Sequence, residues 1–126
     1  MILGLETILI GSPDAKKLGK FYKDTLKLKV IEEMEFGENN EYGIGFDLKN
    51  NVSLYIIDHS KVKGKSVSPD RVMFNLEVDD IEKELKRLKK EKVKIVADIY
   101  HVENYGLIAT LADPDGNYFQ LVKTRE

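Results

Sequence analysis

Apolar and polar residues alternate in short runs along most of this chain, and clusters of turn-forming residues separate the runs. A period of two predicts strands that bury one face, whereas apolar residues three and four apart predict a helix. The first part of the chain reads as strand, helix and three strands, at residues 2–10, 13–25, 29–36, 42–48 and 52–57. Ser12 suits the N-cap and Pro13 the first position of that helix.

Residues 59–70 lack this periodicity and are rich in Lys, Ser, Gly and Pro, which is typical of a connector. The same order of elements then restarts. Asp79 and Glu82 form a capping box before the apolar positions of a second helix. A turn at residues 113–117 joins the last two strands, and the strands of this part are expected at 72–78, 93–97, 105–111 and 118–122.

The repeated order predicts an α+β fold made of two βαβββ modules. We expect residues 1–126 to form a single domain, with modules at about 1–58 and 71–123 and a connector at about 59–70. Each helix covers one face of its strands and leaves the other face free. Pairing the free faces makes a curved mixed sheet around a central crevice, with the helices on the outer face, and such crevices commonly bind ligands.

Composition narrows the function classes. The chain is 42% hydrophobic and 33% charged, which is apolar enough for a core. Its net charge of -2, with acidic and basic residues interleaved, argues against a nucleic-acid partner. There is no cysteine, so disulfides and thiolate sites are excluded. Glu6 interrupts the apolar start before signal-peptide or membrane-spanning length, so we expect a cytoplasmic protein without a membrane partner.

Four segments carry a family resemblance that covers essentially the whole chain: residues 21–28, 74–81, 105–106 and 113–121. They resemble the vicinal oxygen chelate (VOC) superfamily, which includes glyoxalase I, extradiol dioxygenases and the bleomycin- and fosfomycin-resistance proteins. The last segment, Asp-Pro-Asp-Gly-Asn followed by Tyr-Phe-Gln-Leu, is the most specific of the four. The resemblance implies the two-module fold and a homodimer.

The resemblance implies that metal-using members of the superfamily take their metal ligands from four positions on the pocket face. In this sequence those positions are occupied by Glu6, Tyr55, Met73 and Gln120. An open divalent-metal site needs several imidazole or carboxylate ligands, but this set has one carboxylate and no histidine. We therefore expect no metal and no other cofactor. Gln120 in particular stands where metal-dependent relatives carry a carboxylate.

Several of these residues have a functional and a structural interpretation. Glu6 lies in an apolar run, where a buried carboxylate is costly unless it is paired or its pKa rises. It is either a base or hydrogen-bond acceptor, or a structural partner of Arg71 or a lysine. Arg71 either grips a ligand carboxylate or phosphate with its planar fork or is an exposed residue at a strand start.

The remaining candidates are aromatic and polar. Asn75 shares the predicted pocket face with Met73 and Gln120. Tyr55, Tyr105 and Tyr118 offer hydroxyls on flat apolar bodies, which suits a planar or amphipathic ligand but also ordinary sheet packing. His59 and His101 are expected to be solvated loop residues, unless His101 folds over the crevice as a general base.

These patterns leave three functions open. The first is a metal-free small-molecule-binding protein of the glyoxalase and bleomycin-resistance type, with ligand contacts from Glu6, Tyr55, Arg71, Met73, Asn75, Tyr105, Tyr118 and Gln120. The second is a metal-dependent lyase, isomerase or dioxygenase of the same superfamily, in which Glu6 and His101 are the catalytic candidates. The third is a structural or regulatory subunit with a closed crevice. The sequence leaves the identity of the ligand open.

Overall fold

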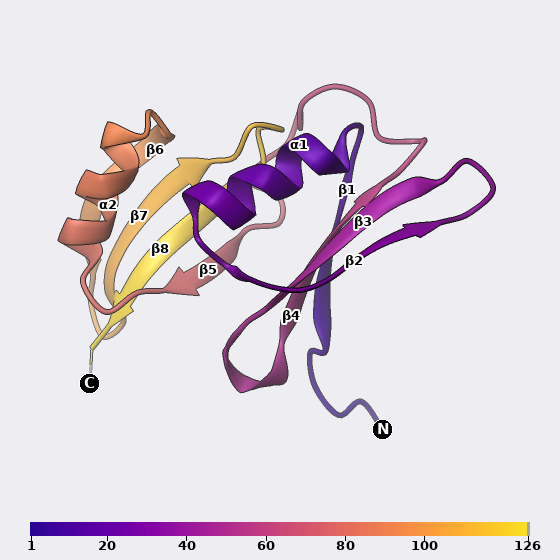
Figure 1. The fold of residues 1–126 in the computed structure, drawn as a ribbon. Coiled ribbons are helices and arrows are strands. Elements are labelled where there is room, and N and C mark those ends of the chain that lie inside the picture. The colour runs from indigo at the N-terminus through magenta and orange to yellow at the C-terminus, as the bar shows by residue number, and fades with distance from the viewer. Residues whose placement is uncertain (126) are drawn as a thin grey trace. The chain divides into compact units, whose positions relative to one another are not determined.

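The computed structural model describes residues 1–125, which form two compact units that divide between Gly64 and Lys65 (Figure 1). This division lies inside the connector predicted at residues 59–70. Each unit contains one four-stranded sheet and one α-helix over the described residues, in the order strand, helix and three strands. The α+β class and the two βαβββ modules are confirmed.

The strands of the first unit are arranged in the order β1-β4-β3-β2. β1 runs parallel to β4, whereas the β2–β3 and β3–β4 pairs are antiparallel. α1 continues into a π-helical turn, Phe21–Thr25. The bounds are β1 (Thr7–Ser12), α1 (Ala15–Lys20), β2 (Lys29–Phe36), β3 (Glu41–Asp47) and β4 (Ser53–Asp58).

The helical segment buries Leu18 and Tyr22 against one face of this sheet, and these two residues are fully buried. Gly19 permits the close approach, because a Cβ there would lie 2.7 Å from Ile44 Cγ2. Alternation along the strands brings a common set of side chains to this covered face: Ile44, Phe46, Leu54 and Ile56. The neighbouring residues on each strand therefore occupy the opposite, open face.

The second unit repeats this arrangement, with the strand order β5-β8-β7-β6. β5 is parallel to β8, and the other pairs are antiparallel. α2 buries Ile81, Leu85 and Leu88 over β7 and β8. The bounds are β5 (Phe74–Glu77), α2 (Ile81–Lys90), β6 (Lys94–Val102), β7 (Gly106–Ala112) and β8 (Tyr118–Thr124).

The turn between β7 and β8 is closed by Asp113, whose side chain is buried. Its Oδ1 accepts hydrogen bonds of 2.9 Å from the main-chain N–H groups of Asp115 and Asn117. Gly116 takes the left-handed φ of +80°, which favours glycine. The turn thereby sets the register in which Gln120 lies opposite Thr110.

Several predicted boundaries in the first unit are wrong. The first strand begins at Thr7, and residues 1–6 form no regular structure. Ser12 ends that strand, and the cap of α1 is Asp14, which accepts from the N–H of Lys17. The apolar run at the start misled the prediction, because β1 pairs with β4 only from Thr7 onwards.

In the second unit, Asp80 and not Asp79 is the N-cap of α2. The first strand of this unit starts at Phe74, so Arg71 and Met73 precede it. His101 belongs to β6, which extends to Val102, and is not the loop residue expected. Among the described residues, no helix is long and apolar enough to cross a membrane.

Candidate functional site

The open face of the second sheet carries a row of polar side chains across three neighbouring strands. Asn75 on β5 lies opposite Gln120 on β8, which in turn lies opposite Thr110 on β7. Residues opposite each other in a sheet point to the same face. Phe119 and Leu121, which flank Gln120, are buried on the face that α2 covers.

Hydrogen bonds connect the side chains of this row in series. The Thr110 hydroxyl donates to Gln120 Oε1 over 2.8 Å, and Gln120 Nε2 donates to Asn75 Oδ1 over 2.8 Å. Asn75 Nδ2 then donates to the hydroxyl oxygen of Tyr105 over 3.0 Å. We call these four residues the amide row. Thr110 is buried, whereas Asn75 and Tyr105 are exposed, so the row runs from the interior to the surface.

The main chain around Tyr105 is held closely against the end of β8. Gly106 has a φ of +143°, and a Cβ there would lie only 2.2 Å from the main-chain oxygen of Lys123. Only glycine fits such an approach to backbone. The carbonyl of Tyr105 accepts a 2.9 Å hydrogen bond from the N–H of Arg125. The Tyr105-Gly106 pair therefore positions the exposed end of the amide row.

The open face of the first sheet has an equivalent row of Glu32, Gly45 and Tyr55. The Tyr55 hydroxyl donates to Glu32 Oε2. A Cβ on Gly45 would lie 2.5 Å from the Tyr55 ring, so the bare glycine leaves space for that ring to cross β3. The hydrogen bond to Glu32, followed by burial and the charges of Glu32 and Glu6, raises the pKa of Tyr55.

Glu6 lies immediately before β1 and is exposed, so the burial expected from its apolar neighbours is wrong. Its main-chain carbonyl accepts a 3.1 Å hydrogen bond from the N–H of Ser53. Its charge contributes to the raised pKa of Tyr55. The first unit thus groups Glu6 with Tyr55 and Glu32.

The other predicted residues are more isolated. Arg71 and Met73 are exposed in the segment before β5, and His101 is exposed on β6. Tyr118 is half-buried at the start of β8, opposite Ala112. The second unit therefore brings together Asn75, Tyr105 and Gln120 of the predicted set.

Comparison with known proteins identifies the family. A family model described as the glyoxalase-like domain matches residues 5–125. The chain belongs to the glyoxalase-like family. No curated protein matches the sequence of this glyoxalase-like domain.

Solved structures share its fold at low sequence identity. SMU.1112c is 17% identical with a TM-score of 0.81, over 98% of this chain and 100% of the other. TnmS3, an antibiotic binding protein from Streptomyces sp. CB03234, is 20% identical with a TM-score of 0.77, over 98% of both chains. The trypanothione-dependent glyoxalase I of Leishmania major is 19% identical with a TM-score of 0.76, over 97% of this chain and 87% of the other. These likenesses establish the fold of the glyoxalase-like domain.

The residues at the four positions that metal-using VOC proteins employ fit a metal poorly in this glyoxalase-like domain. Both amide atoms of Gln120 are engaged in hydrogen bonds, and the Tyr55 hydroxyl is bound to Glu32. Met73 offers a thioether, a poor ligand for a hard or borderline cation. Among residues 1–125, no three His, Asp or Glu side chains are grouped so that they could hold a metal ion.

Sequence reasoning missed two polar side chains of these rows, Thr110 and Glu32. Thr110 is a polar residue inside the apolar strand β7, and counting strand positions across the turn at residues 113–117 would have found it. Glu32 had no such signal. A register shift between Val30 and Glu32 turns its side chain toward Tyr55, and alternation along β2 does not reveal this irregularity.

Proposed function

We propose that this glyoxalase-like domain binds a small organic molecule without a divalent metal. The observation that carries the proposal is the amide row. Gln120 stands at a ligand position of metal-using relatives, and its amide oxygen and amide nitrogen are both hydrogen-bonded within this row. Such an arrangement favours a neutral polar contact surface over a cation site.

The amide row also indicates which ligand groups it prefers. In the hydrogen-bonded arrangement described, the Tyr105 hydroxyl accepts from Asn75 and keeps its own proton for an outside acceptor. The second N–H of Asn75 is a further donor at this exposed end. A ligand with a carbonyl or hydroxyl oxygen beside a flat apolar part would suit these donors and the tyrosine ring.

The likeness to TnmS3 supports binding, because its description names it an antibiotic binding protein. The likeness to a glyoxalase I supports the alternative that this domain is a metal-dependent enzyme. The donor set favours binding over metal-dependent catalysis, since the four metal-using positions hold one carboxylate, an amide, a phenol and a thioether, and no imidazole.

A thermal-shift screen of aromatic carbonyl compounds and hydroxylated aromatics, on protein purified without chelators, tests the proposal. We expect at least one compound to raise the melting temperature with a saturable dependence on its concentration. Asn75→Ala should weaken that compound about tenfold, because it removes one donor and takes away the hydrogen-bond partner of Gln120 Nε2 and of the Tyr105 hydroxyl. Elemental analysis of the same protein should find no stoichiometric zinc, nickel, iron or manganese.

Asn39→Ala is the matched control, since Asn39 is an exposed asparagine in the turn between β2 and β3. It should bind the compound as the wild type does. Equal losses of affinity in both variants would show that the amide row does not contact the ligand. If no compound in the screen raised the melting temperature, the proposal of small-molecule binding would be rejected. Stoichiometric metal would overturn the metal-free part and favour the enzyme.

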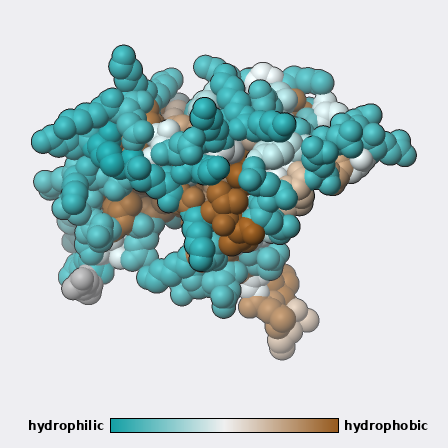
Figure 2. Space-filling model, viewed as in Figure 1, coloured by the Kyte–Doolittle hydropathy of each residue, from teal (hydrophilic) through white to brown (hydrophobic). Residues whose placement is uncertain are grey.

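We also propose that the domain forms a homodimer, as the VOC resemblance implies. The support is a group of exposed apolar side chains at the start of the chain: Met1, Ile2, Leu3, Leu5 and Leu9. Figure 2 shows hydrophobic residues protruding at the N-terminal end of the chain. Contiguous exposed apolar groups commonly mark protein–protein contacts.

A further inference from the structure

Thr110 is the buried end of the amide row, and apolar side chains flank its hydroxyl on β6 and along β7. It lies opposite Ala97 on β6 and opposite Gln120 on β8. Its neighbours on the same face of β7 are Ile108 and Ala112, because strand side chains alternate. Only 6% of Thr110 is exposed, and its hydroxyl donates to Gln120 Oε1. Among the described residues, this hydroxyl has no hydrogen-bond partner besides Gln120.

The amide row has a direction, because each hydrogen bond fixes the next one. Thr110 donates to the amide oxygen of Gln120, so the amide nitrogen of Gln120 faces Asn75 and donates to its Oδ1. This contact leaves Asn75 Nδ2 to face Tyr105, whose hydroxyl oxygen accepts. If Gln120 alone turned over, its oxygen would face Asn75 Oδ1, and two acceptors would meet. The two amides therefore turn over together or not at all.

The opposite direction would leave a buried proton without an acceptor. With both amides turned over, Gln120 Nε2 would donate to the Thr110 oxygen, and the Tyr105 hydroxyl would donate to Asn75. The Thr110 proton would then meet only apolar side chains on β6 and β7. A buried donor without an acceptor is costly, whereas the observed direction places that proton on Gln120 Oε1. Thr110 thus favours the direction that leaves the Tyr105 proton outside the row.

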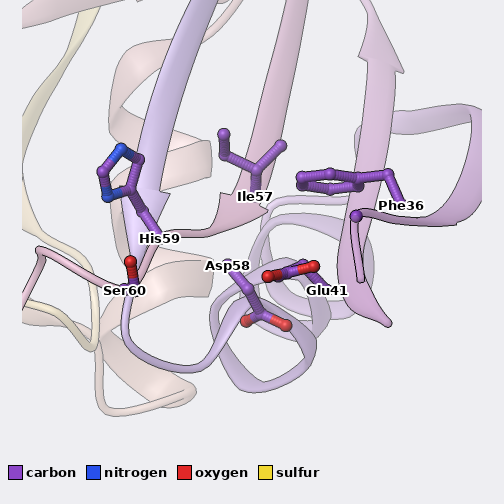
Figure 3. A pocket seen from close by; sticks show the side chains of 7 residues that line it. Phe36, Glu41, Ile57, Asp58, His59 and Ser60 are labelled. Carbon is purple, nitrogen blue, oxygen red and sulfur yellow. The ribbon is translucent and has the colours of Figure 1, made fainter. Parts of the chain in front are cut away.

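The polar groups of the first unit are arranged differently. The Tyr55 hydroxyl donates to Glu32. An open depression at the end of β4 is lined in part by Asp58 and His59 (Figure 3). Asp58 accepts from the main chain at the starts of α1 and β3, and His59 Nδ1 accepts from the main chain of the following loop. The Tyr105 hydroxyl, by contrast, is exposed and has no acceptor among the described residues.

We propose that Thr110 is a positioning residue that fixes the direction of the amide row and thereby makes Tyr105 a hydrogen-bond donor to the ligand. This direction selects an aromatic carbonyl compound, whose oxygen accepts from the Tyr105 hydroxyl and whose ring packs beside the tyrosine. A ligand that offers only a donor would face the Tyr105 proton with another proton. The ligand half of this inference rests on the proposed function, whereas the direction of the row does not.

The direction of the row can be measured by NMR without a ligand. In the isotope-labelled, deuterated full chain, we expect a trans-hydrogen-bond scalar coupling from Gln120 Nε2 to Asn75 Cγ. Thr110→Val should weaken this coupling about twofold, because either direction then keeps the same number of hydrogen bonds within the row. The opposite coupling, from Asn75 Nδ2 to Gln120 Cδ, should appear in that variant. Thr110→Ser, which retains the hydroxyl, should restore the wild-type pattern.

The ligand preference is measured by amide NMR titration with acetophenone and indole, which are similar in size. Acetophenone offers a carbonyl acceptor and no donor, whereas indole offers an N–H donor. We expect the wild type to bind acetophenone about fivefold more tightly than indole. Thr110→Val should reduce this preference to about twofold or less, because the reversed row presents the Tyr105 oxygen as an acceptor. Thr110→Ser should retain the preference, and Tyr105→Phe should remove it.

Thr7→Val is the matched control, since the Thr7 hydroxyl also donates a hydrogen bond in a strand, to the main-chain oxygen of Ser53 in the first unit. It should leave the coupling and the preference unchanged. An opposite coupling in the wild type, an unchanged coupling in Thr110→Val, or equal preferences in wild type and Thr110→Val would each overturn the proposal. If Thr110→Val does not fold, the coupling and the preference of the wild type still decide.

The two readouts separate this inference from the proposed function. If neither compound binds the wild type, the ligand half is rejected together with small-molecule binding, and the coupling still shows whether Thr110 directs the row. If acetophenone binds but the coupling in Thr110→Val is unchanged, the proposed function stands and the role of Thr110 is rejected.

Discussion

At the scale of single residues, Tyr42 has a strongly raised pKa. Burial, and then the hydrogen bond to Glu33 and the charge of that carboxylate, raise the pKa of Tyr42 to about 12. Its hydroxyl donates to Glu33, and Lys16 Nζ lies 5.5 Å from its ring centroid. The neutral phenol is therefore favoured in the folded chain.

This raised pKa predicts a pH dependence of stability. Because the unfolded-state pKa is about 10, the Tyr42 contribution is fully present below pH 10 and is lost as the pH rises toward 12. In an ultraviolet titration of the folded protein, we expect one tyrosine to ionise near pH 12. Tyr42→Phe should remove this step and flatten the loss of unfolding free energy between pH 10 and 12. Persistence of the step in Tyr42→Phe would contradict the assignment.

At the scale of elements, the start of α2 depends on one of two adjacent aspartates. Asp80 Oδ1 accepts a 3.1 Å hydrogen bond from the N–H of Lys83, which lacks an intrahelical acceptor. Asp80→Ala should lower the free energy of unfolding by about 1 kcal/mol. Asp79→Ala, the control at an exposed neighbour, should change it by less than about 0.5 kcal/mol. Urea unfolding measures both, and equal effects would show that the cap contributes nothing.

At the same scale, two glycines of β3 shape the open face of the first sheet. Gly43 and Gly45 carry no side chain on the open face, so residues from the neighbouring strands cross over them. Phe36 and Ile57 meet above Gly43, and the Tyr55 ring lies above Gly45. The same alternation places large side chains, Ile44 and Phe46, on the covered face. One strand thus builds both the core and the floor of the open face.

At the scale of the whole molecule, the proposed homodimer predicts a definite molecular mass in solution. Light scattering after size exclusion should give twice the 14.4 kDa mass of one chain. Leu3→Glu combined with Leu9→Glu should shift the protein to the single-chain mass, because each change places a charge in the exposed apolar group. Val67→Glu is the control, since Val67 is also exposed but lies in the connector. A single-chain mass for the wild type would reject the dimer.

Much of the fold follows from local sequence information. The duplicated order of elements, the β2 bounds and the turn at residues 113–117 all follow from alternation and turn chemistry. Asn75 and Gln120 could be assigned to one face because strand side chains alternate with a period of two. The family also follows from these segments, as the match over residues 5–125 confirms.

The tertiary structure decided the contacts that depend on register and pairing. The run before Thr7 is apolar but has no β4 partner, so it forms no strand. Glu32 reaches Tyr55 through an irregularity in β2, and the turn at Gly37 lies so close to the Glu41 carboxylate that a Cβ at residue 37 would be 2.3 Å from Oε2. Such contacts join residues distant in the chain or depend on local backbone geometry, which hydrophobic periodicity does not encode. The sequence by itself therefore determined the modules and their covered faces, while tertiary packing decided which polar groups meet on the open faces.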